Sequence, residues 1–281
     1  MRYPWLQDPQ PHAFFLGDYA ALKRDYLPPD YRRDAAGHQV VKTVHVEAEC
    51  SREQQVAETL WLSELHQRHG LPNAIVAHAW FHTPRAEEIL AAQAAQPLVR
   101  GIRSKPVTGR TPGESVAGAP GSMQDPQWRA GLRLLARHKL SWDLRVPTWH
   151  LEEAARVVAD NPDIPVALNH TGFPWDRSEA GLALWRRGMQ ALAGCGQVYC
   201  KLSCLCLPEE PWGYESNRRI VLEAIELFGV ERCMFASNFP VDGLRVGFER
   251  MFTDFKRMTA GLTAQERQQL FHDNAQAFYR L

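Results

Sequence analysis

Short apolar runs alternate along the chain with amphipathic stretches of helical period. The apolar runs end in polar residues, Gly or Pro, which is typical of buried parallel strands. The stretches between them carry hydrophobic residues three and four positions apart and therefore predict helices. Ser51-x-x-Gln54 and Thr263-x-x-Glu266 predict capping boxes at two helix starts. The predicted strands lie at residues 41–49, 74–80, 98–103, 140–146, 166–170, 198–203 and 233–240. The predicted helices lie at residues 51–69, 86–95, 127–138, 151–159, 180–192 and 218–227, and two more end the chain.

The repeated strand and helix units predict an α/β fold, a TIM (β/α)8-type barrel. A closed barrel needs eight strands, and because the pattern shows seven, we expect the first strand to be missing. With 281 residues, of which 45% are hydrophobic, the chain suits one domain over residues 1–281. Residues 1–40 are rich in Pro and aromatic side chains and are expected to be a loop-rich segment. Residues 108–124, rich in Gly and Pro, predict a flexible loop, which is either a lid over a site or an insertion without a role.

Polar residues stand at the carboxyl ends of the predicted strands, which meet at one rim of a barrel, where barrel enzymes hold their catalytic groups. In the first predicted strand, His45, Glu47 and Glu49 alternate with apolar residues and are expected to face the interior. An antiparallel edge strand with a wet face is the alternative. His170 ends the strand that begins at residue 166. The other rim candidates are Arg103, Arg145, Lys201, Asn238 and, in the loop after Asn238, Asp242.

The composition of the chain indicates which classes of binding partner are not favoured and in which cell compartment the protein is expected. The net charge is zero and the isoelectric point is about 7.2, so nothing favours nucleic acid or an anionic membrane. No apolar run is long enough for a membrane span, and no signal-peptide pattern opens the chain, so we expect a cytoplasmic protein. The six cysteines form no C-x-x-C pair and are expected to be reduced core residues. The sequence leaves a homo-oligomer open.

Several segments together carry a family resemblance that runs in order over nearly the whole chain. They are residues 44–49, 99–103, 168–172 and 235–240, with Asn274-Ala275 and residues 279–281 at the end. These segments resemble the amidohydrolase-related TIM-barrel hydrolases, in particular the branch of sugar-acid lactonases and pyrone-dicarboxylate lactonase. The resemblance implies a hydrolase that opens a lactone of a sugar acid or of a related small carboxylic acid. It also implies a divalent metal such as zinc, although a metal-independent site is the alternative.

Two departures from the family pattern affect the expected chemistry. Family members begin with a strand that ends in His-x-His, and this sequence contains no His-x-His. The last family strand carries an Asp that orients or deprotonates the attacking water, whereas this chain has Asn238. An amide can hold a water molecule but cannot act as its base. Asp242 supplies a carboxylate in its place only if the loop folds back.

The resemblance and the chemistry of hydrolysis assign roles to the rim residues. His170 is expected to bind a metal or to polarise water, with a structural histidine as the alternative. Glu47 is the second candidate metal ligand, and Glu49 is a candidate for the metal or substrate site. Both carboxylates could instead pair with Arg103, Arg145 or Lys201, because inward-facing charges need partners.

The cationic residues are candidates for binding an acidic substrate and stabilising the oxyanion. Arg103 and Arg145 are expected to bind substrate oxygens, since the forked guanidinium suits planar oxygen groups. Lys201 is expected to stabilise the oxyanion, and a salt bridge with Asp143 or Glu47 inside the barrel is the alternative. Two further functions stay open: a metal-dependent decarboxylase of the same superfamily, and an inactive, truncated barrel.

Overall fold

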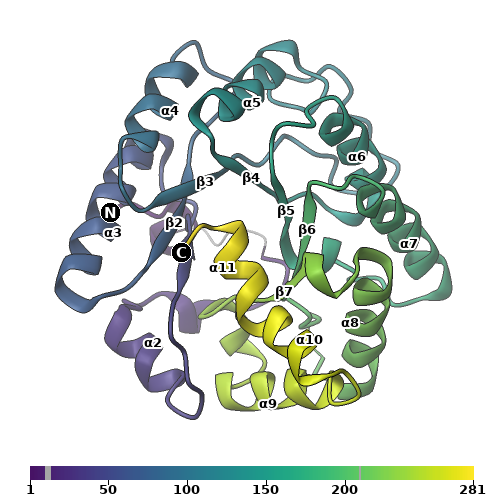
Figure 1. Ribbon diagram of the computed structural model, residues 1–281. Coiled ribbons are helices and arrows are strands. Elements are labelled where there is room, and N and C mark those ends of the chain that lie inside the picture. The colour runs from purple at the N-terminus through teal and green to yellow at the C-terminus, as the bar shows by residue number, and fades with distance from the viewer. Residues whose placement is uncertain (10–13, 209) are drawn as a thin grey trace.

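The computed structural model of the chain describes residues 1–9, 14–208 and 210–281. These residues form one sheet of seven parallel strands in chain order, β1 to β7, which curls into a ring (Figure 1). The strands are β1 (Val44–Val46), β2 (Ala74–His78), β3 (Val99–Arg103), β4 (Ser141–Leu144), β5 (Val166–Leu168), β6 (Val198–Leu202) and β7 (Cys233–Phe235). The described residues contain no strand between β7 and β1. The fold is therefore an incomplete α/β barrel of TIM type, as the sequence predicts.

Alternate residues of each strand face the helices or the barrel interior. Trp142 pairs with Val166, and both pack in the large outer core under the helices. One position on, Asp143 pairs with Ala167, which in turn pairs with Tyr199 and lies in a small inner cluster. Paired residues of parallel strands point to the same face, so polar side chains at every second position enter the barrel.

Helices cover the outside of the sheet (Figure 1). They are α3 (Gln55–His69), α4 (Ala86–Ala94), α5 (Pro126–His138), α6 (Leu151–Ala159), α7 (Glu179–Ala193), α8 (Tyr214–Phe228) and α9 (Phe248–Met258). In α5, Trp128, Leu132 and Leu135 are buried, whereas Arg133 and Arg137 are exposed. This is the helical period that the sequence shows. Within the described residues, no helix combines the length and apolar character needed to cross a membrane.

The C-terminal residues close the amino-terminal end of the barrel. Helix α10 (Ala264–Gln268), a π-helical turn (Gln269–Asp273) and α11 (Asn274–Phe278) run across the ring (Figure 1). The Asn274 side chain donates to the carbonyl of Cys233 at the start of β7. Phe278 and Tyr279 then pack against Val76 and Met234 of the inner face. The floor of the barrel is therefore apolar and filled by side chains.

The segment predicted to be loop-rich contains three short helical pieces, although residues 10–13 lie outside the described part. These pieces are α1 (Pro4–Gln7), the 3-10 turn η1 (Ala20–Leu22) and α2 (Pro28–Asp34). In α2, Tyr31 packs edge-on against Phe248 of α9, and Arg32 donates to the carbonyl of His69 at the end of α3. Because α3 follows β1 and α9 follows β7, α2 lies across the side where the sheet is not closed.

The expectation that His45 faces the interior is wrong. Val46 pairs with Val76 and packs in the inner cluster, whereas His45 pairs with Ile75, which belongs to the outer core. The strict alternation of side chains along a strand puts His45 on the opposite face from Val46. Glu47 lies beyond the last residue of β1, where the strand geometry has ended, and it does turn inward.

The Gly-rich stretch 108–124 has no helix or strand of its own but is attached to its surroundings. Only an isolated bridge between Val107 and Ser122 pairs its ends. The amide of Gly109 donates to Nε2 of His150 at 3.0 Å, and Trp149 Nε1 donates back to the Gly109 carbonyl at 3.0 Å. These contacts fix the loop against the residues that follow β4.

The cysteine prediction is confirmed for the described residues. All six cysteines are free thiols, and five of them are buried. They act as small core residues of the sheet and of its carboxyl end.

Replacement of Gly101 by Ala should destabilise the barrel because the inner face is closely packed at this position. A Cβ atom there would lie 2.2 Å from Oγ and 3.0 Å from the carbonyl oxygen of Ser141 on the neighbouring strand. We expect a loss of about 1–3 kcal/mol in the free energy of unfolding, measured by urea denaturation. Gly113→Ala is the control, since nothing lies within 4 Å of its Cβ position. Equal stability of the two variants would contradict the described packing.

Candidate functional site

A buried carboxylate marks the middle of the barrel. Asp143 of β4 is fully buried, and its Oδ1 accepts hydrogen bonds from Lys201 Nζ on β6 and from Asn169 Nδ2, the latter at 2.9 Å. The Tyr279 hydroxyl lies 3.2 and 3.3 Å from the two carboxylate oxygens. Burial lowers the pKa of Lys201, and the Asp143 charge opposes this effect. These groups satisfy one another, so they form a structural layer between the floor and the rim.

Above this layer, Glu47 and Arg103 form a second buried ion pair. Arg103 Nε donates to Glu47 Oε1 at 2.6 Å, and Arg103 Nη2 donates to the Glu47 carbonyl at 2.5 Å. Burial alone would raise the pKa of Glu47, but the Arg103 guanidinium lowers it to about 2. His78, at the end of β2, has Nδ1 3.8 Å from Glu47 Oε2, and its Nε2 is buried without a hydrogen-bond partner among the described residues.

His170 lies at the rim, directly after β5, and is held in its neutral form. Its Nδ1 lies 3.0 Å from the Ser203 hydroxyl, which follows β6. Burial lowers the pKa of His170 well below its usual range, and neighbouring positive charges lower it further. In order of effect, these charges are Arg145, Arg103, Lys201 and Lys105. A neutral imidazole among cations can hold water or a substrate oxygen, but it does not become a cation itself near pH 7.

Two of these cations lie at the outer edge of the rim. Lys105 Nζ forms an ion pair with Glu49 Oε1 at 2.5 Å, and the Glu49 side chain is 42% exposed. Arg145, which follows β4, has no hydrogen-bond or ion-pair partner within the described residues. Its guanidinium carbon lies 5.0 Å from the centre of the Phe173 ring. Arg145 is therefore the rim cation with donors left to bind an anion.

A carboxyl group with a raised pKa lies in the loop after β7. Asp242 is fully buried, and its Oδ1 accepts a hydrogen bond of 2.7 Å from Asn238 Nδ2. Its Oδ2 has no partner among the described residues. Burial raises the pKa of Asp242 to about 7, although bonds from Asn238 and from the backbone of Cys204 oppose the rise. Ser203, which contacts His170, is followed by Cys204, whose backbone bonds to Asp242, so His170 and Asp242 both contact this short segment.

The backbone at the rim is strained at six residues that follow strands. Their φ angles lie in the left-handed region, which costs a residue other than Gly about 1–3 kcal/mol. These residues are Glu49 (φ 61°), His170 (60°), Thr171 (53°), Phe173 (55°), Cys204 (54°) and Asn238 (50°). Strain of this kind persists only where the surroundings enforce it, and it collects at functional sites. The strained backbone turns the side chains of His170 and Asn238 at the ends of β5 and β7.

The structure brings the sequence-predicted site residues to one end of the barrel but gives some of them other partners. Lys201 forms an ion pair with Asp143, which is the alternative predicted for it from the sequence. The Lys201 charge is therefore neutralised below the rim. The Nε and Nη2 donors of Arg103 are used by Glu47. Asp242 folds back onto Asn238, as a substitute carboxylate requires.

Four polar residues of the site were not singled out as active groups by the sequence. His78 ends its apolar strand just as His170 does, so its position was a signal. Lys105 stands two residues after Arg103, and Ser203 two after Lys201, which is the spacing of one strand face. Tyr279 gave no comparable signal, because its hydroxyl reaches Asp143 only through the fold of the C-terminal residues.

The residues do not fit a metal centre. Among the described residues, no three His, Cys, Asp or Glu side chains come close enough together to hold an ion. Glu47, expected as a ligand with His170, is neutralised by Arg103, and Asp143 is neutralised by Lys201. We therefore derive no catalytic step through a metal.

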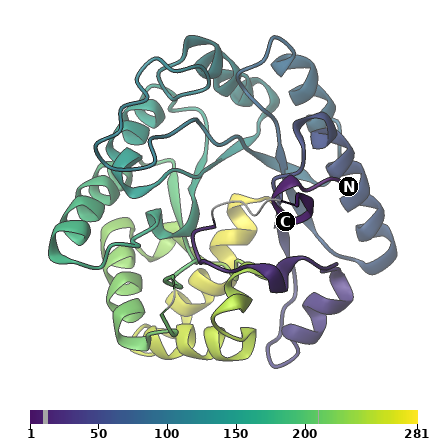
Figure 2. The ribbon, with the colours of Figure 1, turned by 180° about the vertical axis from the view of Figure 1, so that it is seen from behind.

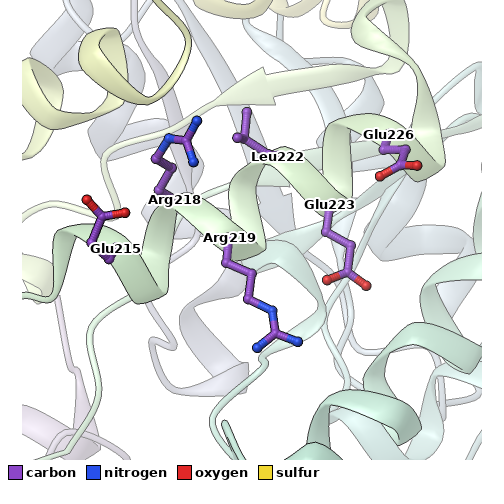
Figure 3. Close-up of a pocket in the computed structure, with 6 residues that line it drawn as sticks. All are labelled: Glu215, Arg218, Arg219, Leu222, Glu223 and Glu226. Atoms are coloured by element: carbon purple, nitrogen blue, oxygen red, sulfur yellow. The ribbon is translucent and has the colours of Figure 1, made fainter.

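Two hollows of the described surface lie outside this group of rim residues. One, of about 440 Å³, lies on the exposed face of α8 and is lined by charged residues such as Arg218, Arg219 and Glu223 (Figure 3). A second, also about 440 Å³, is lined by Leu22 and Phe248 and by Phe239, Pro240 and Gly243 from the loop that holds Asp242. The first is lined by residues of one exposed helix face and by none of the rim residues, whereas the second borders the Asn238–Asp242 loop.

Comparisons with known proteins agree with this fold. An uncharacterised protein of Sinorhizobium fredii, y4mH, is 39% identical over 99% of this chain and 93% of its own length. An L-fucono-1,5-lactonase of Burkholderia multivorans is 26% identical over 99% of this chain and 91% of its own.

A solved structure shares the architecture. It is an amidohydrolase from Burkholderia multivorans with bound HEPES, with a TM-score of 0.82, 23% identity, and coverage of 100% of this chain and 96% of that one. A second crystal form of an amidohydrolase from the same organism contains bound zinc and gives a TM-score of 0.81 at 23% identity. The family model for amidohydrolases matches residues 3–281. The chain thus belongs to the amidohydrolase family and is a hydrolase of that family.

Proposed function

We propose that this hydrolase opens the lactone ring of a sugar acid or of a related small carboxylic acid. The observation that carries the proposal is a neutral imidazole, His170, surrounded by cations, with the buried carboxyl of Asp242 beyond Ser203 and Cys204. Ester hydrolysis needs a base for water and positive groups for the oxyanion, and the rim supplies both. The L-fucono-1,5-lactonase relative supports this substrate class.

In this proposal Asp242 is the general base. The pKa of Asp242 is about 7, and a general base works best when its pKa is near the working pH. Its Oδ2 has no protein partner among the described residues and can accept a proton from water. Asn238 donates to Oδ1 and so orients the carboxylate. Asn238 thereby acts as a positioning residue, which explains how an amide can stand where the family has an Asp.

The cations and His170 bind the substrate. Arg145 holds the carbonyl oxygen that becomes negative, and Lys105 adds positive charge beside it. His170, fixed by Ser203, positions the water or a substrate hydroxyl through Nε2. Arg103 and Lys201 fix the interior through their pairs with Glu47 and Asp143.

The steps balance without a co-reactant other than water. Asp242 removes a proton from water as the oxygen attacks the lactone carbonyl, and the carbonyl electrons move to the oxygen held by Arg145. The ring C–O bond then breaks, and the leaving alkoxide takes the proton from Asp242. The new carboxylic acid ionises, so each turnover releases one proton.

Replacement of Arg145 by Met should weaken substrate binding. Loss of a charge-assisted hydrogen bond costs about 1.5–3 kcal/mol, so kcat/KM for a lactone should fall about 10- to 100-fold. Lys139→Met, far from the rim at the end of α5, is the matched control because it removes a cation of similar length. Steady-state kinetics on both variants test the role. Unchanged kcat/KM in Arg145→Met would show that Arg145 does not contact the substrate.

A substrate panel tests the function itself. We expect the protein to release protons from gluconolactone and fuconolactone above the spontaneous rate, followed by pH-stat titration. Hydroxybenzoates in the same panel, with carbon dioxide detection, test the decarboxylase alternative. Carbon dioxide from the aromatic acids without acid release from any lactone would reject the lactonase proposal.

A further inference from the structure

Aromatic side chains form a continuous surface that leads from the N-terminal segment to His170. Phe15 stacks on Trp175 with ring centres 5.2 Å apart and planes at 23°. Trp175 packs on Phe173 at 4.6 Å, and Phe173 meets the His170 ring edge-on at 5.0 Å. We call Phe15, Trp175 and Phe173 the aromatic wall. It brings a residue from near the start of the chain to the candidate site.

Hydrogen bonds attach the N-terminal segment to the carboxyl end of the barrel on both sides. Trp5 Nε1 donates to the carbonyl of Ala48, after β1, at 2.9 Å, and the Tyr3 hydroxyl donates to Glu58 of α3 at 2.9 Å. On the other side, Arg245 in the loop after β7 donates to the Leu16 carbonyl. Figure 2 shows this purple segment across the ring, on the side opposite the C-terminal helices. The segment therefore holds Phe15 over the rim.

The aromatic wall also contains an unused hydrogen-bond donor. The indole Nε1 of Trp175 is shielded from solvent and has no acceptor among the described residues. A buried tryptophan N–H usually has a partner, so this donor is available to a ligand. Arg145, the cation with free donors, lies against Phe173 of the same wall. Flat apolar faces, a neutral donor and a cation are thus collected beside His170.

We propose that Phe15 and Trp175, the two partly exposed members of the aromatic wall, bind the ring of the substrate over the buried Phe173, and that Phe15 determines specificity for it. This inference rests on the proposed function of the rim. The ligand class is a six-membered ring compound with an apolar face, which stacks on Phe15 and Trp175, and an oxygen at its edge, which accepts from Trp175 Nε1. Such stacking contributes binding without touching the reacting carbonyl.

Two lactones that differ in one ring test the proposal. Dihydrocoumarin is δ-valerolactone with a benzene ring fused to it, so it adds an aromatic face; because its leaving group is a phenolate and not an alkoxide, each lactone is compared only with itself between variants. Phe15→Leu keeps an apolar side chain of similar size but removes the flat ring. We expect it to raise KM for dihydrocoumarin about fivefold, as for the loss of one aromatic pairing, and to raise KM for δ-valerolactone, which has no aromatic face, less than this.

Two further variants separate stacking from general packing. Phe15→Trp restores a flat ring and should restore KM for dihydrocoumarin. Phe14→Leu is the matched control for loosened packing, because Phe14 stacks on Trp5 at 5.6 Å and packs on Phe15 at 4.8 Å but is not part of the aromatic wall. It should leave KM for both lactones unchanged. Equal rises in KM for the two lactones in Phe15→Leu would overturn the proposal in favour of rim packing.

A binding measurement keeps this test separate from the proposed reaction. Calorimetric titration with the ring-opened acid of dihydrocoumarin needs no turnover, and circular dichroism checks that each variant is folded. Binding that weakens about fivefold in Phe15→Leu supports the aromatic wall even if neither lactone is hydrolysed. Binding of equal strength in wild type and Phe15→Leu, or no binding by wild type, overturns it.

Discussion

The Asp242→Asn variant should lose most of the proposed lactonase activity while staying folded. Asn keeps the shape and one acceptor oxygen of the side chain, but it cannot take a proton from water. Loss of a general base lowers the rate about 10²- to 10⁴-fold, and we expect this fall in kcat/KM for gluconolactone by pH-stat assay. A fall in kcat/KM of less than about threefold is what the loss of one weak hydrogen bond would cause. Such a result would show that Asp242 is not the general base.

The same substitution should also raise stability above pH 7. Burial raises the pKa of Asp242 from 3.8 to about 7 in the folded state. The stability that the protonated group contributes is therefore complete below about pH 4 and is lost as pH rises through 7. Above pH 7, a buried negative charge opposes folding. The neutral Asn variant should consequently melt at a higher temperature than wild type at pH 8.

Glu58→Gln is the matched control for both effects. Glu58 of α3 is also buried, and burial, with the nearby Glu47 charge, raises its pKa to about 7. It lies beneath the N-terminal segment, where Tyr3 and the backbone of Ala48 donate to it. We expect Glu58→Gln to melt higher at pH 8 as well, but to keep its kcat/KM. A large loss of activity in this control would mean that burial of a carboxyl group, and not its place at the rim, accounts for the Asp242 result.

The Asp143→Ala variant should show the largest loss of stability. It leaves the Lys201 ammonium, 8% exposed, without its counter-ion inside the barrel. Removal of one partner of a buried pair costs about 3–5 kcal/mol, and we expect this loss in the free energy of unfolding from urea denaturation. Tyr279→Phe, which removes only a hydroxyl donor to Asp143, should cost about 0.5–1.5 kcal/mol.

A double variant tests whether the charge itself is responsible. Asp143→Leu combined with Lys201→Met replaces both charges by apolar side chains, and it should be more stable than Asp143→Ala because no unpaired charge remains. A double variant as unstable as the single one would instead attribute the loss to altered packing in the barrel.

The strands and helices were predictable because their signals are local. A buried strand such as residues 74–78 reads as an apolar run, and Thr263 does form a capping box with Glu266. The other expected capping box, Ser51 with Gln54, does not form, because the Gln54 side chain accepts a hydrogen bond from the amide of Arg2. The long-range contact between Gln54 and Arg2 replaces the local capping contact. A local sequence pattern cannot predict a contact between residues so far apart in the chain.

Several members of the site were predictable, but the sequence left open which charges pair with one another. The carboxyl ends of parallel strands must meet, so Arg103, His170 and Lys201 were certain to gather if the barrel formed. Two charged side chains can pair only if they lie at the same depth in the barrel. That depth follows from the register between neighbouring strands, which the sequence does not give. Asp143 and Lys201 lie one layer of inward-facing side chains below the rim. Arg145, two residues after Asp143, lies at the rim, and it keeps its donors free because no carboxylate of the described residues pairs with it there.

The dependence of kcat/KM on pH tests the central claim most directly. With gluconolactone, after subtraction of spontaneous hydrolysis, wild type and Glu58→Gln should both show activity that rises as pH approaches about 7 and then levels off, because Asp242 loses its proton there. The residual activity of Asp242→Asn should lack this transition. A wild-type profile without a transition near pH 7, or a transition that persists in Asp242→Asn, would contradict the account.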